Sequence, residues 1–285
     1  MFHDVSQANE ERVRRFLLAH SDTSIYLLSG LQPGHPANLT NRSFGPFRCL
    51  EHDGQIVAVL SLTPSGDLLV ETGGRGDLVK DVMAACAQDR VPITGVVAEW
   101  NAASTVWNTL CDGYLSPTYE AKQVVHRLEL DSVDPSPRVP SVRALSMDDF
   151  HQWQVLNTEL IKGAGWPVPP DAETWKVGFS KRSRAGYVWG AFDNEELVSM
   201  ALLDTVYEHI GQIGNVFTTE RRRRSGFGVA VLRTLIDEAK AIHGLERLVL
   251  FTAESNSKAR RMYERLGFRV AGEFGLLFGS RKEVA

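Results

Sequence analysis

The fold is decided by the stretch Arg221-Arg222-Arg223-Arg224-Ser225-Gly226-Phe227-Gly228, which stands between an apolar run at 209–219 and an amphipathic run at 229–242. The two runs predict a strand and a helix joined by a tight turn. Glycines carry no Cβ, so the backbone of this turn can approach a ligand closely and adopt positive φ. The first amides of a helix have no intrahelical partner and lie at the positive end of its dipole. We therefore expect the turn to bind an anion such as a pyrophosphate, helped by the four arginines.

The spacing of the glycines distinguishes this turn from two better-known nucleotide loops. A P-loop requires a lysine after its last glycine, and Val229 follows Gly228 here. The dinucleotide fingerprint requires a third glycine where Val231 stands. The remaining pattern, Arg223-x-x-Gly226-x-Gly228, resembles the acyl-CoA pyrophosphate signature of the GNAT acyltransferase superfamily.

A second motif follows a short apolar run at 246–252, which predicts a buried strand. It reads Asn256-x-x-Ala259-x-x-x-Tyr263-x-x-x-Gly267-Phe268 and again resembles the GNAT family. The resemblance implies that Asn256 hydrogen-bonds the pantetheine arm and that Tyr263 lies beside the thioester sulfur as a general acid. Two structural alternatives stay open, because Asn256 is also a good helix N-cap and Tyr263 lies on an apolar helix face.

The resemblance implies acetyl-CoA as the cosubstrate, without a metal. We expect its site to consist of strand, turn and helix residues, namely Val216, Phe217, Thr218, Arg223, Arg224, Ser225, Gly226, Phe227, Gly228, Asn256, Ala259 and Tyr263. Strand amides near 216–218 could stabilise the oxyanion that forms when an amine attacks a thioester. The amine also needs a general base. Glu208 and His209, at the start of the strand, are the nearest titratable candidates, although both could be ordinary strand-edge residues.

Composition limits the classes of protein that the chain can represent. Its 285 residues, 43% of them hydrophobic, exceed one minimal domain of this family and suggest two cores. The net charge of −4 argues against a general nucleic-acid binder, although the arginine run alone would permit one. Three widely spaced cysteines do not form a metal pattern. Neither a membrane span nor a signal-peptide core is evident, so we expect no membrane partner and a cytoplasmic protein.

A boundary between two domains is predicted at 131–140, where three prolines stand among polar residues. The prediction is one domain at 1–130, a linker at 131–140 and a second domain at 141–285. The second domain opens with a capped helix at 150–160 and a loop at 163–171 over which an acceptor could lie. A hairpin around Asp193-Asn194 follows. A closing strand is expected at 270–279.

The first half repeats this order of elements. A hairpin around Asp53-Gly54 corresponds to the one at Asp193-Asn194, and Gly74-Arg75-Gly76 opens a helix at 77–88 as Gly226-Phe227-Gly228 opens the later one. A run at 93–98 then precedes Glu99-Trp100-Asn101, as the later strand precedes Asn256. We interpret the chain as a divergent internal duplication. The alternative is two unrelated α/β halves that resemble each other by chance.

The two copies differ at the positions that carry chemistry. Glu71 stands where counting from the glycines places Arg223, and Asn108 stands where the second copy has Tyr263. The first copy is therefore expected to be catalytically inactive and to complete the acceptor pocket or to cover a sheet edge. The chain would then act as a monomer or a weak homodimer.

The fold expected from the resemblance is α/β (α+β), with two GNAT-like domains, each a mixed, mostly antiparallel twisted sheet flanked by helices. The expected activity is N-acetyl transfer from acetyl-CoA to a primary amine of a small molecule or amino acid, by direct attack in a ternary complex. Two alternatives remain, a non-catalytic acyl-CoA-binding or regulatory module and a protein N-terminal or lysine acetyltransferase.

Overall fold

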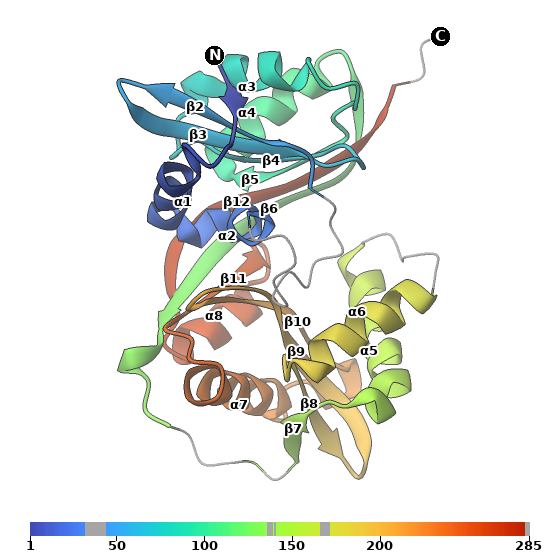
Figure 1. Ribbon diagram of the computed structural model, residues 1–285. Coiled ribbons are helices and arrows are strands. Elements are labelled where there is room, and N and C mark those ends of the chain that lie inside the picture. The colour runs from blue at the N-terminus through green and yellow to red at the C-terminus, as the bar shows by residue number, and fades with distance from the viewer. Residues whose placement is uncertain (32–43, 136–138, 140, 166–171, 283–285) are drawn as a thin grey trace.

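The computed structural model describes residues 1–31, 44–135, 139, 141–165 and 172–282. These residues form one sheet of 12 strands with helices on both faces (Figure 1). The strands are β1 (His3–Asp4), β2 (Phe47–His52), β3 (Gln55–Leu62), β4 (Asp67–Glu71), β5 (Gly95–Glu99), β6 (Leu115–Glu129), β7 (Val142–Ala144), β8 (Val188–Asp193), β9 (Glu196–Tyr207), β10 (Ile210–Thr218), β11 (Arg247–Ala253) and β12 (Arg269–Arg281). The main helices are α1 (Glu10–Ala19), α2 (Ser21–Gly30), α3 (Val79–Cys86), α4 (Trp100–Cys111), α5 (Phe150–Ala164), α6 (Ala172–Arg184), α7 (Phe227–Ala241) and α8 (Ser257–Arg265).

The strand order confirms the internal duplication. The order across the sheet is β1-β2-β3-β4-β5-β12-β6-β11-β10-β9-β8-β7. Each strand of the first half has its counterpart six strands later in the chain, and the two counterparts lie at equal distances from opposite ends of the sheet. Both halves contain one parallel pair, β4 with β5 and β10 with β11, and the other neighbours are antiparallel. Each half is therefore a mixed, mostly antiparallel sheet, as predicted.

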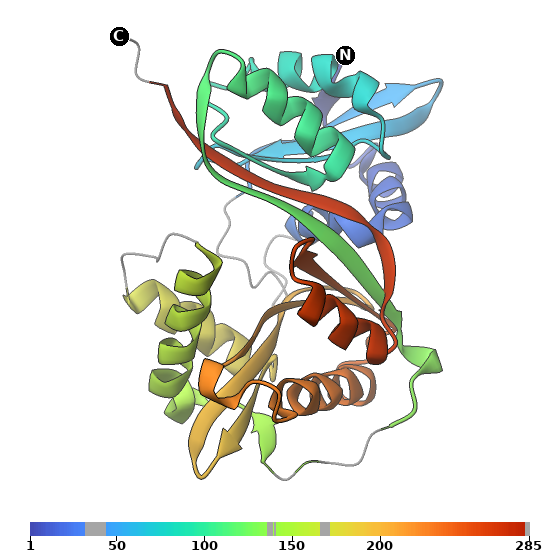
Figure 2. The ribbon, with the colours of Figure 1, turned by 180° about the vertical axis from the view of Figure 1, so that it is seen from behind.

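The last strand of each half lies inside the sheet of the other half. β6 pairs with β11 on one side and with β12 on the other, and β12 pairs in turn with β5. Figure 2 shows these two long strands crossing the molecule side by side, from one half into the other. The two copies thus exchange strands, and the sheet is continuous across the predicted 131–140 boundary.

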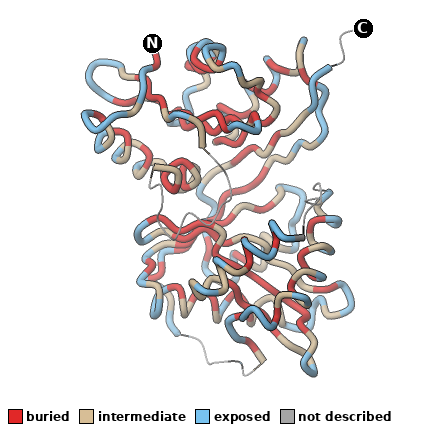
Figure 3. Tube along the Cα trace, turned by 45° about the vertical axis from the view of Figure 1, so that its right-hand side comes forward, coloured by how far each residue is buried: buried red, intermediate tan, exposed pale blue. Residues whose placement is uncertain are grey.

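The helices divide between two faces of the sheet. On the side that we call the α6 face, α5 and α6 pack on the second half, while α1 and α2 pack on a core that contains Tyr207 of β9 and Phe274 of β12. On the opposite side, the α8 face, α3 and α4 cover the first half, and α7 and α8 cover the second. Buried residues, red in Figure 3, run along the strands of both halves. The core under α1 and α2 therefore joins the two copies.

Several local predictions are confirmed. Asp53 and Asn194 adopt positive φ at the two hairpin turns, and a capping box of Ser146 with Asp149 starts the turn that leads into α5. Helices α1, α2 and α6 were not predicted. Of the predicted acceptor loop, 163–164 belong to α5, Gly165 ends that helix with a φ of 71°, and 166–171 lie outside the described residues. No helix in the described part of the chain is long and apolar enough to cross a membrane.

Candidate active site

The sheet opens between β10 and β11. These parallel strands pair only from Ile210 with Arg247 to Ile213 with Leu250. Beyond that point the residues of β10 that still pair do so with β9, and β11 continues only with β6. The strip 214–218 of β10 is partly exposed. A splayed strand pair of this kind is the site that the family resemblance predicts for acyl-CoA.

The glycine turn stands beside this opening. Gly226 is the N-cap of α7 with a φ of 86°, a conformation that suits glycine. The first backbone hydrogen bond of the helix joins the Ala230 amide to the Gly226 carbonyl. The amides of the three preceding residues, 227–229, therefore lack an intrahelical acceptor and can bind an anion. A Cβ added to Gly228 would lie 3.0 Å from the Thr218 Oγ1, so a side chain there would crowd the end of β10.

The four arginines before the turn do not have equal roles. Arg221 forms an ion pair with Glu196, and the Arg222 Nε lies 2.6 Å from Asp193 Oδ2. Both acids belong to the β8–β9 hairpin, so these two charges are already neutralised. The Arg223 Nε donates to the Thr218 carbonyl at 3.3 Å and its guanidinium lies 5.9 Å from the centre of the Phe217 ring. Arg223 lies 3.9 Å from the exposed carboxylate of Glu220, a longer contact than those of Arg221 and Arg222. Arg223 and Arg224, rather than the whole run, are therefore the better placed to attract a phosphate.

Helix α8 presents the second motif. The Asn256 side chain accepts a hydrogen bond from the Ala259 amide at 3.2 Å, so it does cap the helix, and its own amide group remains able to donate to a ligand. Tyr263 is buried, with ring centres 5.7 Å from His126 and 6.0 Å from Phe268. Burial raises the pKa of the Tyr263 phenol, which keeps it protonated. Tyr263 is thus a core residue whose phenol is in the form that a general acid requires.

Glu208 and His209 do not lie where a general base is needed. They form the turn before β10, at the end where that strand is still paired with β11. Glu208 has a φ of 48° and lies 3.8 Å from Arg14, and the His209 ring contacts the Gly244 carbonyl at 3.2 Å. Five residues of extended strand, about 16 Å, separate Glu208 from Ile213, where the opening begins. This geometry places both residues away from the opening and does not support either one as the base.

The sequence did not point to two polar pairs beside the opening. On the α6 face, Asp204 of β9 accepts a hydrogen bond from Arg182 of α6 at 2.7 Å. Asn215 of β10 donates to Asn157 of α5, also at 2.7 Å. The one available signal was an acidic residue within the apolar stretch 197–207.

The first half lacks the opening. β4 and β5 pair without interruption from Asp67 with Gly95 to Val70 with Ala98, one residue before each strand ends. Glu71 is the last residue of β4, is buried, and accepts hydrogen bonds from the Gly73 amide and the Thr23 hydroxyl. Its alignment with Arg223 is therefore wrong, because Arg223 lies in the exposed loop after its strand.

The start of α4 also differs from that of α8. Glu99 caps α4 and accepts from the Asn101 amide at 2.9 Å, so a carboxylate stands where Asn256 stands in the second half. Counted from these two caps, the counterpart of Tyr263 is the buried Val106, and the predicted counterpart, Asn108, is exposed. The first half therefore offers neither an open strand pair nor a phenol.

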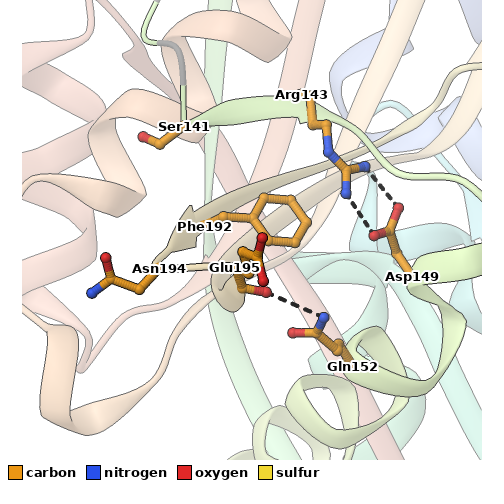
Figure 4. Close-up of a pocket in the computed structure, with 7 residues that line it drawn as sticks. All are labelled: Ser141, Arg143, Asp149, Gln152, Phe192, Asn194 and Glu195. Atoms are coloured by element: carbon orange, nitrogen blue, oxygen red, sulfur yellow. Dashed lines mark hydrogen bonds and ion pairs between the residues drawn. The ribbon is translucent and has the colours of Figure 1, made fainter.

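A separate pocket of about 500 Å³ lies under the β8–β9 hairpin (Figure 4). Arg143 and Asp149 form two hydrogen bonds across it, at 2.7 and 2.8 Å, and Gln152 donates to the Glu195 carbonyl. These polar groups satisfy one another. In the part of the chain that the structure describes, no group of three or more His, Cys, Asp or Glu could hold a metal ion.

The open strand pair, the glycine turn and the Asn256–Tyr263 helix together define the acyl-CoA-dependent acyltransferase class of fold. Residues 143–268 match the acetyltransferase (GNAT) family. The match to this family falls in the second half of the chain, and the first half repeats the same order of strands.

Comparisons with individual proteins agree with this assignment. The chain is 24% identical over 164 residues to the uncharacterised N-acetyltransferase YobR of Bacillus subtilis, which covers 58% of this chain and 57% of YobR. It is 27% identical over 124 residues to mycothiol acetyltransferase of Corynebacterium glutamicum, a match that covers 42% of this chain and 41% of that protein. The matches thus span about half the length of these curated relatives.

Solved structures share the fold along the whole chain. A GCN5-related N-acetyltransferase from Sphaerobacter thermophilus superposes with a TM-score of 0.62 at 18% identity, covering 99% of this chain and 95% of that one. A tandem GNAT protein from the clavulanic acid biosynthesis pathway superposes with a TM-score of 0.58 at 12% identity, covering 100% of this chain and 99% of that one. At these identities the similarity shows the fold alone.

Proposed function

We propose that the protein is an N-acetyltransferase that moves the acetyl group of acetyl-CoA to a primary amine of a small molecule or amino acid within a ternary complex. The observation that carries this proposal is the opening between β10 and β11, which stands beside the unpaired amides of α7. In this proposal residues 141–285 hold the catalytic copy. Residues 1–130 support it through the exchanged strand, and 131–140 join the two.

The pyrophosphate of acetyl-CoA would bind the amides of residues 227–229, with Arg223 and Arg224 adding charge. The pantetheine arm would follow the unpaired edge of β10 at 216–218 and reach Asn256. This route directs the thioester toward the level of Ile213 and Leu250, where the strands separate. Support for it comes from the partial exposure of the whole strip 214–218.

The reaction needs three groups close to Ile213 and Leu250, where the strands separate. A backbone amide of the irregular part of β10 would stabilise the oxyanion, a contribution typically worth about 3 to 4 kcal/mol of barrier. Tyr263 would give its proton to the departing thiolate. The amine must lose a proton to a base, for which Glu208 and His209 are unsuitable.

The experiment that tests the proposal is release of free thiol from acetyl-CoA in the presence of a panel of small amines, amino acids and peptides, with the acetylated product identified by mass. Acetylation of a small amine supports the proposal. Acetyl-CoA binding without thiol release from any amine would favour the non-catalytic module, and acetylation of peptides alone would favour a protein acetyltransferase.

A further inference from the structure

Two β-bulges interrupt the pairing of β9 with β10 beside the opening. Gln212 pairs with Thr205, but the next residue, Ile213, pairs with Leu203, so Asp204 is the extra residue of the first bulge. The second bulge lies between Gly214 and Phe217 and contains Asn215, which has a φ of 49°. Bulges re-aim side chains and are frequent next to active sites. The first bulge places two consecutive residues of β9, Asp204 and Thr205, opposite one residue of β10, Gln212.

The first half serves as an internal comparison. Its corresponding strands pair without any register shift from Val59 with Glu71 to Leu62 with Leu68. The copy without an opening between its parallel strands therefore also lacks both bulges. The irregularity belongs to the half that holds the acyl-CoA site and is not a requirement of the fold.

Asp204 stands at the edge of the opening. A Cβ added to Gly214, the first residue of β10 beyond the paired segment, would lie 3.0 Å from the Asp204 Cβ. One carboxylate oxygen accepts from Arg182 at 2.7 Å, and Arg182 also donates to the Gly178 carbonyl of its own helix. The Asp204 side chain is 27% exposed, against 15% for Arg182. Arg182 thus holds one oxygen of a carboxylate that is itself partly exposed.

Further polar groups share this face. Thr205 is 0% and Gln212 is 4% exposed, and the Thr205 Oγ1 and Gln212 Oε1 have no hydrogen-bond partner among the described residues. Buried polar atoms normally have partners, so each such exception requires an explanation. The Gln212 oxygen can only accept, and it suits a ligand that brings O–H or N–H donors. The two atoms lie on strands that pair directly at these residues.

We infer that Asp204, supported by Arg182, binds and deprotonates the acceptor amine, and that the acceptor is a primary amine with hydroxyl groups close to its nitrogen. This inference rests on the proposed function. The acceptor would lie on the α6 face, with its hydroxyls directed toward Thr205 and Gln212. This inference assigns the role of general base to the Asp204 carboxylate, beside the opening, instead of to Glu208 or His209.

The ammonium gives one proton to Asp204, and the nitrogen lone pair then forms the N–C bond with the thioester carbon. The C–S bond breaks, and the thiolate takes the proton of Tyr263. The nitrogen loses its second proton as the amide forms, which restores the phenol. Asp204 returns its proton to solvent, so one proton is released for each acetyl group transferred.

The test measures kcat/KM for glucosamine and for cyclohexylamine, a ring amine without hydroxyls, together with acetyl-CoA affinity by calorimetry. Wild type should prefer glucosamine by roughly 100-fold or more, because a site built for hydroxyls discriminates strongly against an analogue that lacks them. Thr205→Val should reduce that preference. A preference for cyclohexylamine, or no acetylation of either amine, would overturn the acceptor class.

The role of Asp204 is tested on the full-length chain. Asp204→Asn should lower kcat/KM for glucosamine by roughly 100-fold or more with acetyl-CoA affinity unchanged. Formate should partly restore Asp204→Ala, because a small carboxylate can take the place of the missing base. Glu208→Gln is the matched control and should behave as wild type. Wild-type kcat/KM in Asp204→Asn would overturn the inference but leave the proposed function intact, whereas failure of wild type on every amine of the larger panel would remove both.

Discussion

Ile213 and Leu250 form the last pair between β10 and β11. In the first half the last pair is Val70 with Ala98, one residue before β4 and β5 end, whereas β10 and β11 continue five and three residues beyond Ile213 and Leu250. One parallel strand pair is therefore open and the other is closed. Both pairs have the same place in a repeated sheet, and this difference is the basis for our proposal that only the second copy admits a pantetheine arm.

The first prediction is that one chain binds one acetyl-CoA, in the second half. The closed β4–β5 pair and the buried Glu71 leave no opening between the parallel strands in the described part of the first half. Isothermal titration calorimetry should give a stoichiometry near one, and a value near two would contradict this interpretation.

The second prediction concerns Gly226. Gly226→Val should weaken acetyl-CoA binding by about tenfold or more, because a β-branched residue strongly disfavours a φ of 86° and would displace the amides of the turn. The space around Gly226 is open, so the effect arises from backbone conformation and not from a clash. Gly74→Val is the matched control, since Gly74 has a φ of 78° and open space in the first half. Equal losses of affinity in the two variants would show that the effect is not local.

The third prediction is that Tyr263→Phe lowers turnover about 100-fold or more while acetyl-CoA affinity changes little. The substitution keeps the ring packed against His126 and Phe268 and removes only the proton donor. Tyr187→Phe, which removes a half-buried phenol that packs on His243, controls for a general loss of stability. If acetyl-CoA affinity falls as far as turnover, Tyr263 positions the ligand instead of protonating the thiolate.

The fourth prediction is that residues 141–285 alone do not form a stable, active domain. Without β6, both β11 and β12 lose their partner inside the sheet, and the core under α1 and α2 is lost as well. Circular dichroism should show no cooperative thermal transition. Cutting the full-length chain within 131–140 should instead leave the halves associated and active, because that cut preserves the exchanged strands. An active isolated second half would contradict the prediction.

The fifth prediction concerns the pH dependence of stability. Burial raises the pKa of Glu71, although its hydrogen bonds from Thr23 and Gly73 act in the opposite direction. A carboxyl whose pKa is higher in the folded state contributes stability at low pH, and this contribution is lost as pH rises through the folded pKa. Glu71→Gln cannot titrate, so its Tm relative to wild type should increase from about pH 4 upward. A Tm difference that does not change with pH would show that Glu71 has an ordinary pKa.

Local signals carried most of what could be predicted. The glycine turn, the Asn256 cap and both hairpins depend on residues within a few positions of one another, so their sequence patterns predicted them. Glu71 was misaligned because Gly74 follows the end of β4 by three residues, whereas Gly226 follows the end of β10 by eight. Counting from the glycines cannot detect that difference.

Long-range features had no local signal. Nothing near β6 or β12 specifies that each strand inserts into the other copy, because that choice depends on which sheet edges are free in the folded molecule. Glu208 was proposed as the base because it adjoins β10, but adjacency in sequence does not indicate which end of a strand faces the site. Asp204 was overlooked because its position depends on a one-residue register shift between β9 and β10.

The exchanged strands also determine when the molecule can be completed during its synthesis. While the chain emerges from the ribosome, β5 has no partner on its outer side until β12, at Arg269–Arg281, has been made. An unpaired strand edge is a template for pairing with other chains, and contacts between distant parts of a chain form slowly. The first copy must therefore stay incomplete while the second is translated, and the outer edge of β5 stays open to wrong pairing throughout that interval.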